Sequence, residues 1–110
     1  MIFTTRIPTH FNDGSPVAQS LMNSILVDIH TTFGGYTLEG PAQGAWVDDD
    51  GNVYQETSFR LEVACQRGRY LECRDKVIEI GRQLKQKAMY FEVRYVDGVE
   101  IISIPQHNLP

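Results

Sequence analysis

The stretch from Gly44 to Cys65 constrains the fold more than any other part of the chain. Its two alternating apolar runs flank a short acidic turn, Asp48-Asp49-Asp50-Gly51-Asn52. Alternation of apolar and polar residues on both sides of an Asp, Asn and Gly turn is typical of a β-hairpin. Because this hairpin lies between two helical patterns, it fixes the order of the elements around it.

The segment before the hairpin predicts a strand, a helix and an irregular second strand. Residues 2–7 alternate, with Phe3 and Ile7 on one face. Ser15 can cap a helix whose first turn holds Pro16, and Gly34-Gly35 ends it. The expected core stripe of this helix is Val17, Leu21, Ile25 and Ile29, with Ala18, Met22 and Phe33 beside it. Gly40-Pro41 interrupts the strand that follows, which predicts a bulge.

The segment after the turn predicts a strand, a second helix and a final hairpin. Phe59, Leu61, Val63 and Cys65 alternate with polar residues, as in a strand with one buried face. A helix is expected from Tyr70 to about Lys87, and Gly81 within it predicts close packing of this helix against the sheet. The runs 89–96 and 99–104 are joined by Asp97-Gly98, a strong hairpin signal, which predicts an extra terminal strand.

The element order is strand, helix, strand, strand, helix, strand, which is the split βαβ arrangement of the ferredoxin-like α+β fold. At 110 residues, the chain is predicted to form one domain, 1–110. In this order, and in the hairpin from Gly44-Ala45-Trp46 to Tyr54-Gln55-Glu56 that leads into the strand 59–65, the chain resembles small uncharacterised bacterial ferredoxin-like domains. The resemblance implies an antiparallel sheet with two helices on one face. It leaves the second face free for a ligand or a second subunit, and it assigns no catalytic residue.

Composition argues against several function classes. The formal net charge of −4 disfavours general affinity for nucleic acid or anionic membranes, and the basic residues Arg82, Lys85 and Lys87 have no aromatic stacking platform beside them. We expect no membrane span and no signal peptide, and therefore a cytoplasmic protein. Cys65 and Cys73 are too few for a disulfide framework and lack metal-ligand spacing, so each is predicted to be a small buried hydrophobic residue.

No complete catalytic or metal-binding motif is present. The acidic turn lacks the ligand spacing of a calcium loop, so we interpret it as a structural turn and predict no metal and no cofactor. His10, His30 and His107 are scattered without ligand spacing, although His30 keeps some interest because it lies close to Gly34, Gly35 and Tyr36. An enzyme is therefore the less favoured hypothesis. It would be a small isomerase or oxygenase that uses His30 or His10 with Tyr36 or Tyr54.

Strand alternation gathers charge on the sheet face away from the helices. The residues expected there are Arg6, Arg60, Glu62, Glu92 and Arg94, with Thr4. These side chains can form a ladder of cross-strand ion pairs, pair across a two-fold interface, or hold a carboxylate or phosphate. We favour the first two interpretations, because opposite charges close to one another tend to pair.

Together these patterns favour a small binding or interaction module that acts as a homodimer or tetramer and recognises a small ligand, such as an anion, or a protein partner. Trp46 is placed at the edge of the core or in an interface, because its ring is large and apolar while its indole donor needs a partner. A deep pocket that holds a histidine and a tyrosine would favour the enzyme. A flat apolar surface around Trp46 and Tyr54 would favour assembly.

Overall fold

The computed structural model describes residues 1–106, so His107 and the last three residues lie outside the described part of the chain. The elements follow in the order β1 (Ile2–Pro8), α1 (Gln19–Phe33), β2 (Thr37–Val47), β3 (Val53–Ala64), the short 3₁₀ helix η1 (Arg67–Arg69), α2 (Tyr70–Gln83) and β4 (Phe91–Arg94). The four strands form one antiparallel sheet in the order β2-β3-β1-β4. This is the predicted ferredoxin-like α+β fold.

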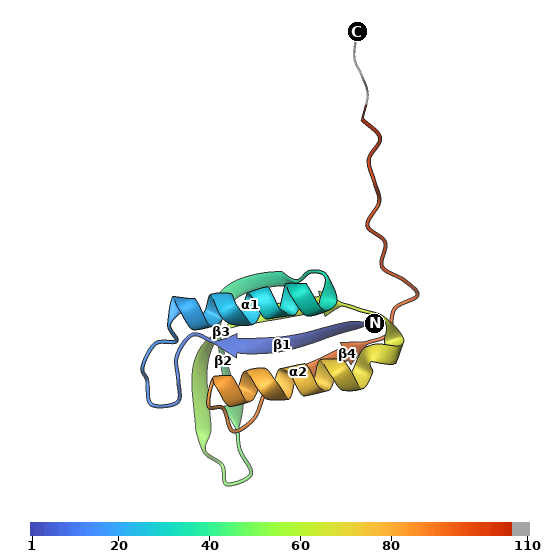
Figure 1. Ribbon diagram of the computed structural model, residues 1–110. Helices are drawn as coiled ribbons and strands as arrows, with labels where there is room; N and C mark the ends of the chain where they lie inside the picture. The colour runs from blue at the N-terminus through green and yellow to red at the C-terminus, as the bar shows by residue number, and fades with distance from the viewer. Residues whose placement is uncertain (107–110) are drawn as a thin grey trace.

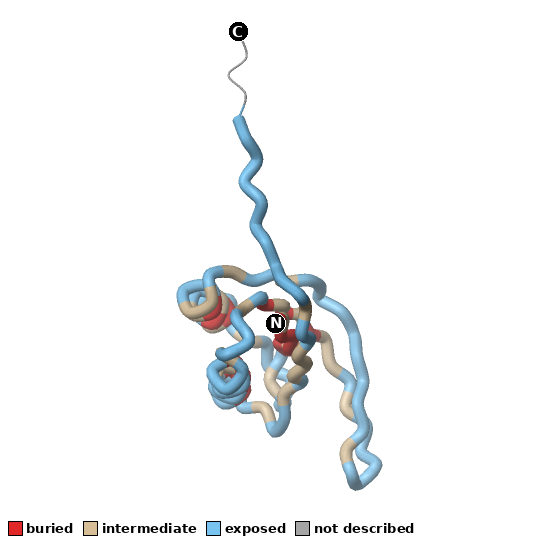
Figure 2. The backbone as a smooth tube through the Cα atoms, turned by 90° about the vertical axis from the view of Figure 1, so that its right-hand side faces the viewer, coloured by how far each residue is buried: buried red, intermediate tan, exposed pale blue. Residues whose placement is uncertain are grey.

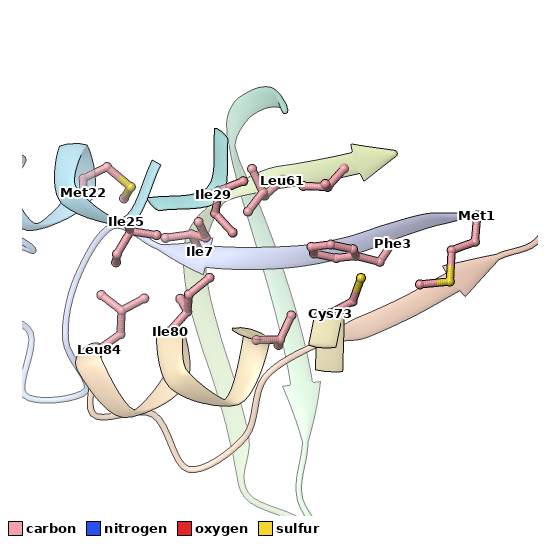
Figure 3. Close-up of a cluster of buried hydrophobic side chains, with 12 residues drawn as sticks. Met1, Phe3, Ile7, Met22, Ile25, Ile29, Leu61, Cys73, Ile80 and Leu84 are labelled. Atoms are coloured by element: carbon pink, nitrogen blue, oxygen red, sulfur yellow. The ribbon is translucent and has the colours of Figure 1, made fainter. Parts of the chain in front are cut away.

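Both helices lie on one face of the sheet, and the buried residues gather between the two layers (Figure 1, Figure 2). The close-up in Figure 3 shows side chains from β1, β3, α1 and α2 meeting there. The core consists of Met1, Phe3, Ile7, Met22, Ile25, Ile29, Leu61, Val63, Cys73, Val77, Ile80 and Leu84. The alternation of β1 and β3 is confirmed, since Phe3 and Ile7 pair in register with Val63 and Phe59 on the helix side.

Helix α1 begins later than Ser15 and Pro16 predicted. The helix starts at Gln19, and Ala18 precedes it without a side-chain cap. Ser15 is engaged elsewhere, because its amide and hydroxyl both donate to Asp13 Oδ1, at 2.9 and 2.5 Å. The predicted end is confirmed, since Gly34 takes the left-handed conformation, with φ of 93°, that glycine adopts without strain. The buried residues of the helix are Met22, Ile25 and Ile29, so Met22 takes the place predicted for Leu21, and Val17 of the predicted stripe lies before the helix.

The bulge predicted in the second strand is present. Strand β2 pairs with β3 along most of its length, and the register shifts between Glu39 and Ala42, across Gly40-Pro41. Helix α2 ends at Gln83, four residues before the expected Lys87. Gly81 does mark a close contact, but its neighbour is Met89 in the loop after α2 rather than the sheet.

The predicted terminal hairpin strand is not formed. Strand β4 contains only Phe91–Arg94, and no strand is present from residue 95 to residue 106. Residues 96–99 still border the body beside Met1 and Arg67, and the chain after them runs away from it as an extended tail (Figure 1). Ile101, Ile102 and Ile104 are all exposed, so the segment gains no burial against the body to offset the entropy cost of ordering it as a strand.

Candidate functional site

The β2–β3 hairpin extends beyond the two helices at one end of the molecule (Figure 1). Its turn is built around Asp48, whose carboxylate accepts hydrogen bonds from the backbone amides of Asp50 and Asn52, both at 2.9 Å, and from the Asn52 side chain at 3.1 Å. The Tyr54 hydroxyl donates to the same carboxylate at 3.1 Å. These hydrogen bonds lower the pKa of Asp48 and raise the pKa of Tyr54. The acidic turn is therefore organised by its own donors, as predicted for a structural turn.

Trp46 and Tyr54 lie directly opposite each other in the hairpin register. Their rings stack with centroids 4.5 Å apart and planes inclined by 17°. Trp46 is 40% exposed and does not belong to the buried core, so of the two positions predicted for it only the interface remains open. The stack gives one face of the hairpin an aromatic surface, and the next pair along the strands, Val47 and Val53, is exposed on the other face.

An open groove of about 1020 Å³ lies at the base of this stack. Its walls come from the loop after β1 (within 10–14), from β2 and β3 (43–46 and 53–57) and from the loop after α2 (86–88). The Thr9 amide and hydroxyl both donate to the carbonyl of Thr57, at 2.9 and 3.1 Å, which fixes the first loop against β3. Lys85 lies over the Phe11 ring, 5.7 Å from its centroid, and links the first loop to the third wall.

The groove brings together His10 and Tyr54, one of the histidine and tyrosine combinations predicted for an enzyme. Both side chains already have partners, however. His10 Nδ1 lies 2.8 Å from the Thr9 hydroxyl, and the Tyr54 hydroxyl is bound to Asp48. His30 and Tyr36 stack elsewhere, with centroids 6.5 Å apart, and His30 is exposed. Within residues 1–106, no group of three or more His, Cys, Asp or Glu side chains could hold a metal ion.

The open face of the sheet carries the predicted charged residues. Arg60 pairs with Glu62 at 3.2 Å and with Glu39 at 4.0 Å. Arg94 pairs with Glu62, and its Nε lies 3.8 Å from Glu92. The ion-pair ladder is thus present, with Glu39 as a member that the alternation argument missed because the bulge hid the register of β2. Arg6 differs from the others: it lies opposite Arg60 and makes no ion pair among the described residues.

Beneath this ladder, the Thr4 hydroxyl is buried without a hydrogen-bond partner among the described residues. Thr4 lies between Glu62 and Glu92 in the register of the sheet. The charges of the open face therefore largely neutralise one another. No helix in the described part of the chain has the length and apolar content needed to cross a membrane.

No protein-family model matches the sequence, and no curated protein matches it. Solved structures match the fold. The divalent cation tolerance protein Cut A1 from Thermus thermophilus superposes with a TM-score of 0.65 at 6% identity, over 90% of this chain and 85% of that chain. A phage SAM lyase in complex with S-methyl-5'-thioadenosine superposes with a TM-score of 0.60 at 10% identity, over 82% of this chain and 76% of that chain. At these identities the likeness establishes the ferredoxin-like fold.

Proposed function

We propose that this protein is a self-associating binding module in which a second copy covers the end of the β2–β3 hairpin. The observation that carries the proposal is the set of exposed apolar side chains at that end: the Trp46–Tyr54 stack on one face of the hairpin, and Val47 and Val53 on its other face. An apolar patch on an element that extends beyond the body is typical of an interface. Strand β2 is also a sheet edge, so its outer backbone groups are free to pair with another strand.

The C-terminal tail supports the same proposal. Four apolar side chains of the tail are exposed: Val99, Ile101, Ile102 and Ile104. Ile101 reaches 92% exposure. The tail leaves the body and makes no strand with it (Figure 2). A strand-forming segment of this kind can add to the sheet edge of a second copy, where its backbone groups gain partners and its side chains lose contact with water.

Light scattering and native mass spectrometry test the proposal. We expect a multiple of 12.5 kDa at micromolar concentration. Trp46→Ala should lower the association constant at least about tenfold, as expected for an aromatic residue at an interface, while the melting temperature of the dissociated chain stays close to that of the wild type. The double change Ile101→Ser and Ile102→Ser should also weaken association.

Val27→Ser is the matched control, because Val27 is 54% exposed in the middle of α1, outside the hairpin and the tail. Its association should equal that of the wild type. A clean monomer for the wild-type protein, or an oligomer that survives both sets of changes, would contradict the proposal.

A small ligand in the groove is the second candidate, and the Trp46–Tyr54 stack favours a planar one. The groove carries His10, Lys87 and Glu56 but is otherwise lined by aromatic, aliphatic and amide side chains, which suits a polar ring of low charge. A small anion bound at Arg6 on the open face is a weaker candidate, because the neighbouring Arg60 already pairs with two carboxylates.

The single tryptophan reports on the groove directly, since Trp46 lines it. S-methyl-5'-thioadenosine, the molecule bound in the SAM lyase neighbour, is a suitable planar probe, and binding should quench the fluorescence of Trp46. Glu56→Gln and Lys87→Gln should change the affinity, whereas Val27→Ser should not. An unchanged spectrum at millimolar probe would exclude this nucleoside as a ligand of the groove.

A further inference from the structure

The two cysteines meet in space although the sequence separates them. Cys65 directly follows the last residue of β3, and Cys73 lies in the first turns of α2. Their Sγ atoms are 3.2 Å apart and both thiols are free. A disulfide bond has an S–S length of about 2.05 Å, so a small rotation of the two side chains would bring the sulfurs to bonding distance.

The surroundings give the two thiols different roles. Cys73 is fully buried, and burial, reinforced by the contact with Cys65, raises the pKa of its thiol to about 12. Cys65 was expected to be buried but is only partly buried, and it lines a cavity of about 460 Å³ with Met1, Arg67 and residues 96–99. A reagent from solvent can therefore reach Cys65 and not Cys73.

The backbone around the pair is held in place on both sides. The Cys65 amide donates to the Met1 carbonyl at 2.9 Å, and the Met1 ammonium group donates to the Cys65 carbonyl at 2.8 Å. Between the cysteines, Arg69 donates to the Glu72 carboxylate and, at 2.9 Å, to the Thr32 carbonyl at the end of α1. The two sulfurs thus stay close without a covalent link.

We propose that Cys65 and Cys73 are a redox site that forms a reversible intramolecular disulfide when the protein meets a peroxide. The Cys65 sulfur, as thiolate, attacks one peroxide oxygen; the O–O bond breaks, the sulfur becomes a sulfenic acid, and the other oxygen leaves as hydroxide and takes a proton to form water. The Cys73 sulfur then attacks the Cys65 sulfur, the S–O bond breaks, and a second water leaves with the thiol proton. Two thiols and one hydrogen peroxide give one disulfide and two waters.

The experiment treats the folded protein with hydrogen peroxide and maps the product. Cleavage after arginine separates the cysteines, because Cys65 lies in the peptide 61–67 and Cys73 in the peptide 70–74. We expect both free thiols to disappear, the intact mass to fall by two hydrogens, and the two peptides to be joined until a reductant is added. Bonds between two copies, or Cys65 oxidised to sulfinic acid beside a free Cys73, would overturn the proposal.

Single substitutions test the order of events. In Cys73→Ala, Cys65 should stop at the sulfenic acid, which dimedone traps. In Cys65→Ser, the buried Cys73 thiol should survive peroxide. In the reduced wild type, iodoacetamide should label Cys65 at least about tenfold faster than Cys73, because Cys73 is fully buried and the pKa of its thiol is raised. Rapid loss of the Cys73 thiol in Cys65→Ser would refute the assigned roles, and the wild-type peptide map decides the proposal even if a variant fails to fold.

Discussion

Replacing Gly81 by alanine tests how closely the loop after α2 packs on that helix. An alanine Cβ at this position would lie 2.7 Å from Met89 Cγ, well inside contact distance. Alanine itself favours the helix by about 1 kcal/mol over glycine, whereas overpacking a buried site costs about 1–3 kcal/mol. The two effects oppose each other, and their balance predicts a loss of up to about 2 kcal/mol in the free energy of unfolding.

A double-mutant cycle with Met89→Ala isolates the contact. Truncating Met89 removes the atoms that the new methyl group would meet, so in that background Gly81→Ala should stabilise the protein by about 1 kcal/mol. Urea unfolding at a fixed protein concentration measures all four proteins, since association makes stability depend on concentration. Gly68→Ala is the matched control, because a Cβ at Gly68 meets nothing within 4 Å. If Gly81→Ala stabilises the wild type as much as it stabilises Met89→Ala, the close packing is refuted.

Three further predictions concern the turn and the core. The hydrogen bonds that Asp48 accepts from Asn52, Tyr54 and Asp50 lower the pKa of its carboxyl group. The stability that Asp48 contributes is therefore present above the ordinary aspartate pKa of about 3.9, and it is lost as the pH falls through the lower pKa of the folded state. The NMR resonance of the Asn52 amide should therefore shift with pH only below about pH 4, and this shift should disappear in Asp48→Asn. A shift near neutral pH would show that another group controls the turn. Millimolar calcium or magnesium should leave the melting temperature nearly unchanged, because the hydrogen-bond donors of the turn already occupy the Asp48 carboxylate. A rise of several degrees that vanishes in Asp48→Asn and Asp50→Asn would reveal a metal site. Leu61→Ala should lower the free energy of unfolding by about 2–5 kcal/mol, because it leaves a cavity in the core. Urea unfolding measures this loss, and a loss below about 1 kcal/mol would mean that the core collapses around the gap.

Local patterns were sufficient for elements whose signal and partner lie close together in the sequence. The β2–β3 hairpin, the end of α1 at Gly34 and the alternation of β1 depend on neighbouring residues only. The Trp46–Tyr54 stack follows from the same register. The predicted start of α1 was wrong because Ser15 can either cap a helix or bond to its neighbour Asp13. In the structure its amide and hydroxyl donate to Asp13, so it caps no helix.

Features made by distant segments were not predictable from one sequence. The third wall of the groove comes from residues 86–88, which meet the hairpin only after α2 has docked on the sheet. The contact between Cys65 and Cys73 depends on where α2 begins relative to the end of β3, a distance that no spacing rule gives. The charged face was predictable as a set because alternation fixes it, while the missing ion pair of Arg6 depends on its register with Arg60.

The tail shows how a strand-forming sequence can remain without a strand inside its own chain. Asp97-Gly98 and the apolar residues after it favour a hairpin locally, yet β4 has only four residues and cannot support a second strand of this length. Strand propensity is satisfied only by hydrogen bonds to another strand. An edge strand of a second copy would supply those bonds, which is why we expect changes at Ile101 and Ile102 to weaken association while leaving the core between the sheet and the helices intact.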